Sequence, residues 1–393
     1  MTASRLDRHL ASYACFPEQS GGRLHPEPES PTRSCFQRDR DRIIHSGAFR
    51  RLKHKTQVFV YHEGDYYRTR LTHSLEVSQI ARSLCRQLGL NEDLAEALAL
   101  AHDLGHTCFG HAGEAALDKA MAPFGGFDHN EQTFRIVTLL EQRYAEFDGL
   151  NLTWETLEGL VKHNGPLPAG KAIPESIAAF QKQMDLRLSG YASAEAQIAA
   201  LADDIAYTNH DIDDGLRAEL FAIEDLLPLP LLGDIVSGIL ARYPGLDTSR
   251  LIHESVRRLI DLMVTDLLVE TRRRLEALAP ATVEEIRGAE RTMVEFSEGM
   301  QRQNQALRDF LFQRMYRHPR VNAAMANAKE VVQRLFAHYR SQPEALPDDW
   351  QALAAGYQER QRARLVADYI AGMTDRYALM DYERIFQVET VEF

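Results

Sequence analysis

Apolar residues recur at spacings of three and four along most of the chain after residue 36, which is the pattern of amphipathic helices. In the first part of the chain, this pattern predicts helices over residues 42–53, 69–88, 91–104, 112–121, 130–147, 153–163 and 193–211. Beyond Pro244, it predicts helices over 250–278, 283–300, 304–316, 321–339 and 349–371. The one strand-like segment is 57–61, close to the turn-forming residues 63–65. We therefore expect an all-α fold with at most one small β-hairpin.

The N-terminal segment lacks this periodicity. Residues 1–35 are rich in Pro, Gly, Ser and Glu between Pro17 and Pro31, which favours an extended arm with one short helix near residues 6–13. No later segment has the composition of a flexible interdomain linker. The sequence thus predicts an arm (residues 1–35), a first helical domain (36–230) and a helical C-terminal subdomain (231–393) packed on it.

Composition narrows the class of protein. The chain has 393 residues, of which 45% are apolar and 26% are charged, as in ordinary globular proteins. Its longest strongly apolar run, residues 94–101, is too short to cross a bilayer, and charges stand where a secretory signal would be apolar. The four cysteines have no metal-site spacing and are expected as free thiols. We expect a cytoplasmic protein without membrane association.

The charge is unevenly distributed. The net charge of −12 argues against broad binding to nucleic acid, which needs a basic surface. Residues 33–55 nevertheless carry +6, which leaves −18 on the remainder. A local basic segment on an acidic protein suits a compact polyanion, and the alternative is a solvated helical face.

Candidate chemistry begins at the end of the predicted helix 91–104. This helix is rich in Ala and Leu and ends on the pair His102-Asp103. Alanines on several of its faces imply close packing, so a buried ionisable pair must be paired or must bind a metal. His73 lies near the start of another predicted helix (69–88), and Asp203-Asp204 lies within a third. Two imidazoles and two carboxylates would make a ligand set for one divalent ion with positions left open.

The chain resembles the HD-domain superfamily of metal-dependent phosphohydrolases, which is defined by the order His, His-Asp, Asp. It is more closely similar to the bacterial dGTPase-like deoxynucleoside triphosphate triphosphohydrolases. The resemblance covers about residues 36–215 and makes 36–230 the HD phosphohydrolase domain. It rests on AFRRLKHKTQV (48–58), YRTRLTHSLEV (67–77), AHDLGH (101–106), FGHAGE (109–114), FDHNEQ (127–132), HNGP (163–166) and ADDIAY (202–207).

This resemblance implies a metal site at His73, His102, Asp103 and one carboxylate of the pair 203–204. Asp203, Tyr207 and Asp211 follow one another at intervals of four residues and so share one helix face. In the family that face carries the metal ligand, a tyrosine near the phosphates and an aspartate at the sugar. We therefore favour Asp203 over Asp204 as the fourth ligand.

The resemblance also implies the remaining site residues. His111 would be the catalytic acid or base, and Glu114, three residues on, would hold its tautomer. His106 and His129 match phosphate-contacting histidines, with packing histidines as the alternative. Arg70 would bind a phosphate and Gln57 the sugar 3′-OH. The roles of Arg50, Arg51, Lys53 and Lys55 stay open.

The implied reaction is metal-dependent hydrolysis of dGTP or several dNTPs to deoxynucleoside and inorganic triphosphate. One divalent ion (Mn, Mg, Fe, Co or Ni) is expected as cofactor. Homo-oligomers, a dNTP as allosteric activator and weak binding of single-stranded nucleic acid are further implications. The alternatives are another HD phosphohydrolase, such as a 5′-deoxynucleotidase, and a catalytically silent regulator that binds nucleotides or nucleic acid.

Overall fold

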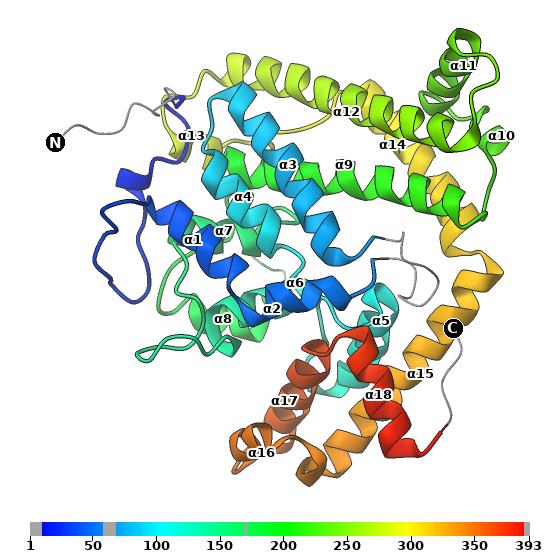
Figure 1. The fold of residues 1–393 in the computed structure, drawn as a ribbon. Helices are drawn as coiled ribbons and strands as arrows, with labels where there is room; N and C mark the ends of the chain where they lie inside the picture. Colours follow the sequence, from blue (N-terminus) through cyan, green and yellow to red (C-terminus); the bar gives the residue numbers. More distant parts are fainter. Residues whose placement is uncertain (1–9, 58–67, 169, 171, 389–393) are drawn as a thin grey trace. The chain divides into compact units, whose positions relative to one another are not determined.

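The computed structural model describes residues 10–57, 68–168, 170 and 172–388, and within them it contains 18 α-helices (Figure 1). These residues form no strand, only three isolated β-bridges. The all-α prediction is confirmed. The predicted hairpin at 57–61 falls, apart from Gln57, outside the described residues. In this part of the chain we find no helix with the length and apolar character that a membrane span requires.

Residue contacts divide the chain into two units, each made from three separate stretches. Unit 1 comprises Met1–Ile43, Ser74–Leu100 and Asn151–His318. Unit 2 comprises Ile44–His73, Ala101–Leu150 and Pro319–Phe393. Three helices cross the division, because the last residue of α1 (Cys35–Ile44), the first turn of α3 (Arg70–Leu88) and the last residue of α4 (Glu92–Ala101) belong to unit 2, whereas the rest of each helix belongs to unit 1. The contiguous domain boundaries inferred from the sequence stay a prediction.

Unit 1 is organised around α9, a helix of 24 residues (Ala194–Arg217) that begins at the N-cap Ser193. This helix packs against α7, α12 and α14. Its first half is apolar on most faces, so neighbours can surround it. The other helices of the unit are α1 (Cys35–Ile44), α7 (Trp154–Val161), α8 (Glu175–Phe180), α10 (Ile223–Leu226), α11 (Leu232–Arg242), α12 (Thr248–Leu278), α13 (Val283–Arg287) and α14 (Glu298–Leu311), followed by the π-helix η6 (Phe312–Tyr316).

Over residues 10–34 the arm consists of turns, bends and irregular structure, and its only helical element is the 3-10 turn η1 (Pro17–Gln19). The described part of the short helix expected near 6–13 is not helical. The fully buried carboxylate of Asp39 anchors the arm by accepting hydrogen bonds from Arg23 at 2.5 Å and from the Thr153 amide at 2.9 Å. A buried carboxylate requires such partners, because desolvation otherwise costs several kcal/mol, on the order of 3–5 when a partner is lost.

The predicted helix over 283–300 is wrong, because α13 ends at Arg287 and α14 starts only at Glu298. The side chain of Gln197 in α9 explains the interruption. Its Oε1 accepts hydrogen bonds from the Thr292 hydroxyl at 2.7 Å and from the amides of Met293 and Val294 at 2.9 and 3.0 Å. In a helix these amides would donate to backbone carbonyls. Here they donate to a side chain from a distant part of the sequence, so the segment is not helical despite its apolar periodicity.

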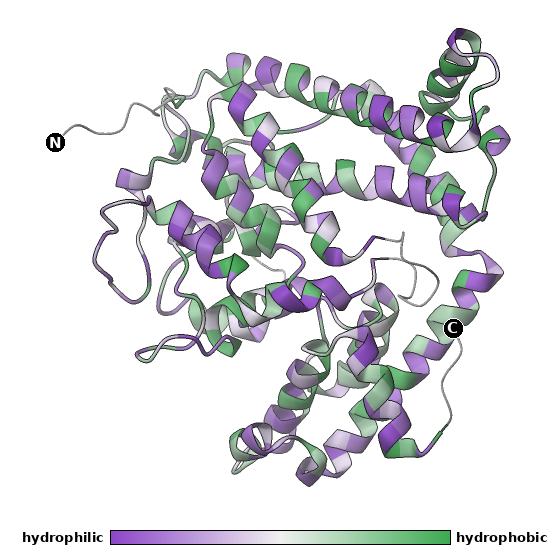
Figure 2. Cartoon of the chain, in the orientation of Figure 1, coloured by the Kyte–Doolittle hydropathy of each residue, from purple (hydrophilic) through white to green (hydrophobic). Residues whose placement is uncertain are grey.

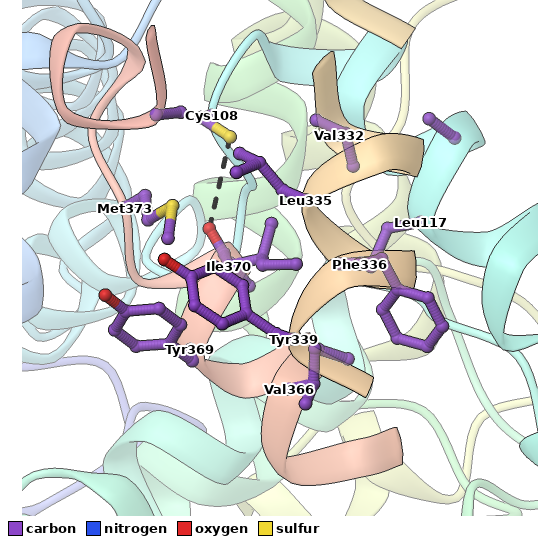
Figure 3. Packing of buried hydrophobic residues seen from close by; sticks show 14 of the residues in the cluster. Cys108, Leu117, Val332, Leu335, Phe336, Tyr339, Val366, Tyr369, Ile370 and Met373 are labelled. Carbon is purple, nitrogen blue, oxygen red and sulfur yellow. Dashed lines mark hydrogen bonds between the residues drawn. The ribbon is translucent and has the colours of Figure 1, made fainter. Parts of the chain in front are cut away.

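In unit 2, α5 (Gly110–Met121) packs on α15 (Pro319–Ser341) and α17 (Glu359–Ala371). Figure 2 shows hydrophilic and hydrophobic residues alternating along α15, as expected of a helix with one buried face. Cys108, Val332, Tyr339 and Ile370 are all at most 1% exposed in this core. Figure 3 shows how they lie among their neighbours. The remaining helices are α2 (Gly47–Arg51), η2 (Leu52–His54), η4 (Ala122–Phe124), α6 (His129–Arg135), the π-helix η5 (Ile136–Leu140), η7 (Pro343–Ala345), α16 (Asp348–Ala354) and α18 (Asp375–Phe386).

Three further predicted helices differ from the structure. The helix over 42–53 is divided at Ser46, which caps α2 by accepting a hydrogen bond from the Phe49 amide. The helix over 130–147 ends at residue 140, because Glu141 adopts an extended backbone and its carboxylate caps the first amides of α2. The helix over 349–371 breaks near Gly356, whose φ of +86° is in the left-handed region that favours glycine.

Gly105→Ala should disrupt unit 2. A Cβ at this position would lie 2.0 Å from the His129 carbonyl oxygen and 2.2 Å from the Thr133 amide nitrogen, both of which are backbone atoms of α6. We expect a loss of about 3 kcal/mol in the free energy of unfolding, measured by denaturant titration. The matched control is Gly238→Ala in α11, where a Cβ meets nothing within 4 Å and the helix should gain up to about 1 kcal/mol. Equal stability of the two variants would contradict the close approach.

Candidate functional site

His102 and Asp103, predicted at the end of α4, lie in a turn of unit 2 (residues 102–106, called the HD turn). The carboxylate of Asp103 has several polar neighbours. Asp103 Oδ1 lies 3.3 Å from His102 Nε2, and its Oδ2 lies 3.9 Å from His73 Nε2. The two imidazole rings have centroids 5.4 Å apart. Arg70 donates from Nη1 to Asp103 Oδ2 at 2.8 Å. All four residues are at most 5% exposed, so the set is buried.

These donors suit a divalent ion. Burial opposes ionisation of Asp103, but His102, Arg70 and His106 outweigh it and hold the pKa of its carboxyl well below the ordinary value. Two imidazoles and an ionised carboxylate are hard-to-borderline ligands of the type that Mn²⁺, Fe²⁺ or Co²⁺ accepts. Nε and Nη2 of Arg70 are buried and make no hydrogen bond to any described residue. They could therefore serve an anion beside such an ion.

His106 and His129 are stacked, with ring centroids 4.0 Å apart and an interplanar angle of 17°. Burial, together with the neighbouring Arg70 and His129, holds the pKa of the His106 imidazole well below its usual value. The ring is thus neutral. Its Nε2 lies 3.2 Å from Asp103 Oδ1, which assigns the single proton to Nε2.

Glu114 in the second turn of α5 orients two histidines. Its Oε2 lies 3.3 Å from His111 Nδ1, and its Oε1 lies 2.7 Å from His129 Nδ1 and accepts the His129 amide at 3.0 Å. Burial acts to raise the pKa of the Glu114 carboxyl, but the hydrogen bonds from His111 and His129 outweigh it and lower the pKa. The ligand atoms of His106, His111 and Glu114 lie within 4.8 Å of one another. A continuous polar cluster thus runs from Arg70 to the half-exposed His111.

Three other predicted site residues, Asp203, Tyr207 and Asp211, lie in unit 1, on α9. Asp203 Oδ2 lies 3.5 Å from His163 Nε2, whereas Asp204 forms an ion pair with Arg308 at 3.0 Å. Desolvation raises the pKa of the Asp204 carboxyl. The engagement of Asp204 by Arg308 supports Asp203 as the candidate ligand.

Tyr207 and Asp211 on the same helix are joined by Tyr316 of η6, which reasoning from the sequence did not find. The Tyr316 hydroxyl donates to Asp211 and lies 2.9 Å from the Tyr207 hydroxyl. No local pattern singles out Tyr316, because it lies 105 residues from Asp211 in the sequence.

Two more polar residues of unit 2 belong to the site's framework. Thr133 accepts the Gly105 amide at 2.9 Å and donates to the His102 carbonyl at 2.9 Å, which pins the HD turn to α6. Gln57 is 5% exposed, and its Oε1 makes no hydrogen bond to any described residue, so an acceptor is available there. Thr133 directly follows the predicted motif 127–132, but its role was not predicted.

The basic segment has a different use from the one its charge suggested. Arg38 and Arg42 form ion pairs with Glu27, Arg40 pairs with Asp93 and Glu96, and Arg33 pairs with Asp41. All of these contacts lie within unit 1. Lys55 in unit 2 is 2% exposed and donates to the carbonyl oxygens of His106 at 2.5 Å and Ala371 at 2.7 Å. Many basic residues of the segment 33–55 therefore form ion pairs or hydrogen bonds within the protein.

Comparison with known sequences defines the class of this protein. Residues 70–208 match the HD domain, and residues 294–384 match the phosphohydrolase-associated domain. The chain is therefore an HD-domain protein of the phosphohydrolase class.

Full-length relatives define the family more narrowly. A deoxyguanosinetriphosphate triphosphohydrolase-like protein of Parvibaculum lavamentivorans is 61% identical over 382 residues, which is 96% of each chain. Proteins of the same name from Cereibacter sphaeroides and Brucella anthropi are 56% and 55% identical over 96% of this chain and 99% and 96% of their own. The chain belongs to the family of deoxyguanosinetriphosphate triphosphohydrolase-like proteins, which confirms the resemblance carried by its motifs.

Lys55→Met should change how stability depends on pH. Burial lowers the pKa of Lys55 from 10.5 to about 7. Between these values the folded state binds fewer protons than the unfolded state, so the free energy of unfolding of the native protein rises with pH by up to about 1.4 kcal/mol per unit. The titratable groups around the amine are Arg51, Arg70, Cys108 and Asp375.

Denaturant titrations between pH 7 and pH 9.5 test this prediction. Lys55→Met should remove this part of the slope, whereas Lys53→Met, at an exposed neighbour, should retain it. The same slope in both variants would show that Lys55 keeps its proton in the folded state.

Proposed function

We propose that this protein is a metal-dependent dNTP triphosphohydrolase that converts dGTP or several dNTPs to deoxynucleoside and inorganic triphosphate. The observation that carries the proposal is the polar cluster in unit 2. It combines a His-Asp donor set, an arginine with unpartnered N–H groups and a carboxylate-oriented histidine. The names of the relatives agree with this reaction.

The metal would be held by His73, His102 and Asp103 of unit 2, with Asp203 as the fourth ligand by its position in the family motif. These ligands would give a divalent ion the role of a Lewis acid toward a phosphate oxygen. Mn²⁺, Mg²⁺, Fe²⁺, Co²⁺ or Ni²⁺ is the expected ion. Arg70 would neutralise phosphate charge through Nε and Nη2, which are already desolvated, so this interaction requires little reorganisation.

The remaining residues would handle the proton and hold the substrate. In its imidazolium form His111 carries two protons: the Nδ1 proton would stay hydrogen-bonded to the Glu114 carboxylate, and the Nε2 proton would be donated to the departing 5′-oxygen. His106 and His129 would contact phosphates. Gln57, Tyr207 and Asp211 would bind the sugar and the adjacent phosphate, with Tyr316 fixing the last two.

The direct test is to reconstitute the full-length protein with each divalent ion and to incubate it with each dNTP, singly and in mixtures. Separation of nucleosides, nucleotides and inorganic phosphates should yield deoxynucleoside and triphosphate. Monophosphate or diphosphate products would indicate another HD phosphohydrolase, such as a 5′-deoxynucleotidase. Binding without turnover under any metal would favour a silent regulator.

The same experiment addresses regulation. We propose a cytoplasmic homo-oligomer in which a second dNTP acts as activator, on the basis of the family resemblance alone. Turnover that appears only in dNTP mixtures supports an activator. The oligomeric state is read from the molar mass in solution, and weak retention of single-stranded nucleic acid is measured in parallel.

His111→Ala should lower kcat by about 10² to 10⁴, which is the usual contribution of a general acid or base. Bound metal and nucleotide affinity should stay close to those of the native protein, because His111 is not among the expected metal ligands. The control is His253→Ala, which removes an exposed histidine of α12 in unit 1. Unchanged turnover in His111→Ala would remove its assigned role.

A further inference from the structure

Two adjacent residues of unit 2, Lys55 and Thr56, connect the HD turn to the segment that enters α18. Lys55 Nζ donates to the carbonyl of His106 and to that of Ala371. The Thr56 amide and hydroxyl both donate to Asp375 Oδ2, the amide at 2.9 Å. These contacts join parts of the chain that are more than 300 residues apart in the sequence.

Asp375 extends this connection to the helix of His111. Its other oxygen, Oδ1, accepts the amide of Phe109 at 2.8 Å. Phe109 is the N-cap residue of α5 and has a φ of +60°, a conformation that costs a non-glycine residue free energy. The carboxylate thus holds the strained residue from which α5 starts, two positions before His111.

A third contact lies beside these. Cys108 Sγ is 4.0 Å from the Ile370 carbonyl oxygen, as drawn in Figure 3, in the core where α17 approaches the turn. Cys108 and Asp375 are 0% and 1% exposed. Asp375 is thus shielded from bulk solvent, so loss of its carboxylate would leave three buried N–H and O–H donors without their acceptor.

We propose that Asp375 is a positioning residue for the reaction: through Phe109 it sets the start of α5 and hence His111, and through Thr56 it sets Gln57. This inference rests on the proposed function. Asp375 belongs to the phosphohydrolase-associated region. In this proposal that region helps to position the acid-base pair His111 and Glu114 without contacting the substrate. Nothing in the HD motif itself indicates this dependence.

The structure offers a matched control in the same helix. Asp381 of α18 is also buried, at 5% exposure, and its carboxylate binds the Tyr339 hydroxyl and Arg384. Asp381→Asn therefore removes a buried charge from α18 without touching the HD turn. In Asp375→Asn one oxygen becomes an amide nitrogen that cannot accept a hydrogen bond, so either Thr56 or Phe109 loses its acceptor.

The first measurement compares kcat and KM of both variants, per folded molecule, at a temperature below both unfolding transitions. Asp375→Asn should lower kcat/KM about 10- to 100-fold, the cost of a misplacement near 1 Å, while metal content stays native. Asp381→Asn should remain within about twofold, as for substitutions remote from the chemistry. Similar kinetics of the two variants would overturn the proposal, since both remove a buried charge.

Thr56→Val provides a second, milder variant, which removes the hydroxyl donor to Asp375 and keeps nearly the same side-chain volume. If Asp375 acts partly through the Thr56 hydroxyl, the double variant Asp375→Asn, Thr56→Val should lose less in kcat/KM than the product of the two single losses. If the loss of kcat/KM in the double variant equals the product of the two single losses, Asp375 does not act through the Thr56 hydroxyl. Should Asp375→Asn fail to fold, Thr56→Val alone must lower kcat/KM more than Asp381→Asn does.

Amide hydrogen exchange tests the connection without any turnover. Asp375→Asn should speed exchange in peptides covering residues 104–112, whereas Asp381→Asn should speed it around Tyr339. Unchanged exchange at 104–112 in Asp375→Asn would overturn the proposal. A native protein that does not hydrolyse dNTPs would instead refute the proposed function, and the exchange result would still decide whether Asp375 fixes the turn.

Discussion

The buried carboxylate of Asp103 imposes the constraint around which the rest of unit 2 is arranged. An ionised group without water must be compensated by charges and hydrogen bonds, and Arg70, His102 and His106 provide them. Each of these partners is itself buried and needs further contacts. The stacked pair of His106 and His129 and the Glu114 carboxylate extend the compensation outward, until the cluster reaches the surface at His111.

Much of the helical content and most of the cluster could be predicted from the sequence, because both depend on local patterns. Helical periodicity located α9 and α15, and the motifs identified the residues that the structure brings together in unit 2. Two of the wrong helices have local causes, the Ser46 cap and the left-handed Gly356, and the other two arose where a side chain from far away intervenes. Gln197 straightens the chain at 292–294, and Glu141 leaves its helix to cap α2. Tyr316 is of the same kind, since nothing near it in the sequence relates it to Asp211.

Charge counting was less informative than motif order. The basic stretch 33–55 suggested a site for a polyanion, but burial determines what each cation does. Arg38 and Arg42 hold Glu27, and the amine of Lys55 is directed to two carbonyls. By contrast Arg70, outside that stretch, keeps desolvated N–H groups with no hydrogen bond to the described residues. The number of cations near a site therefore says less about its ligand than the unsatisfied hydrogen bonds within it.

The link between Phe109 and Asp375 also bears on how the protein is made. These residues are separated by 266 positions. At a synthesis rate of about 5–20 residues per second, the nascent chain carries the histidine turn for roughly 13–53 seconds before its carboxylate partner is translated. During that interval the Phe109 amide lacks its acceptor, Lys55 lacks the Ala371 carbonyl, and α5 lacks the neighbours α15 and α17. The acid-base geometry is thus one of the last features acquired during biogenesis.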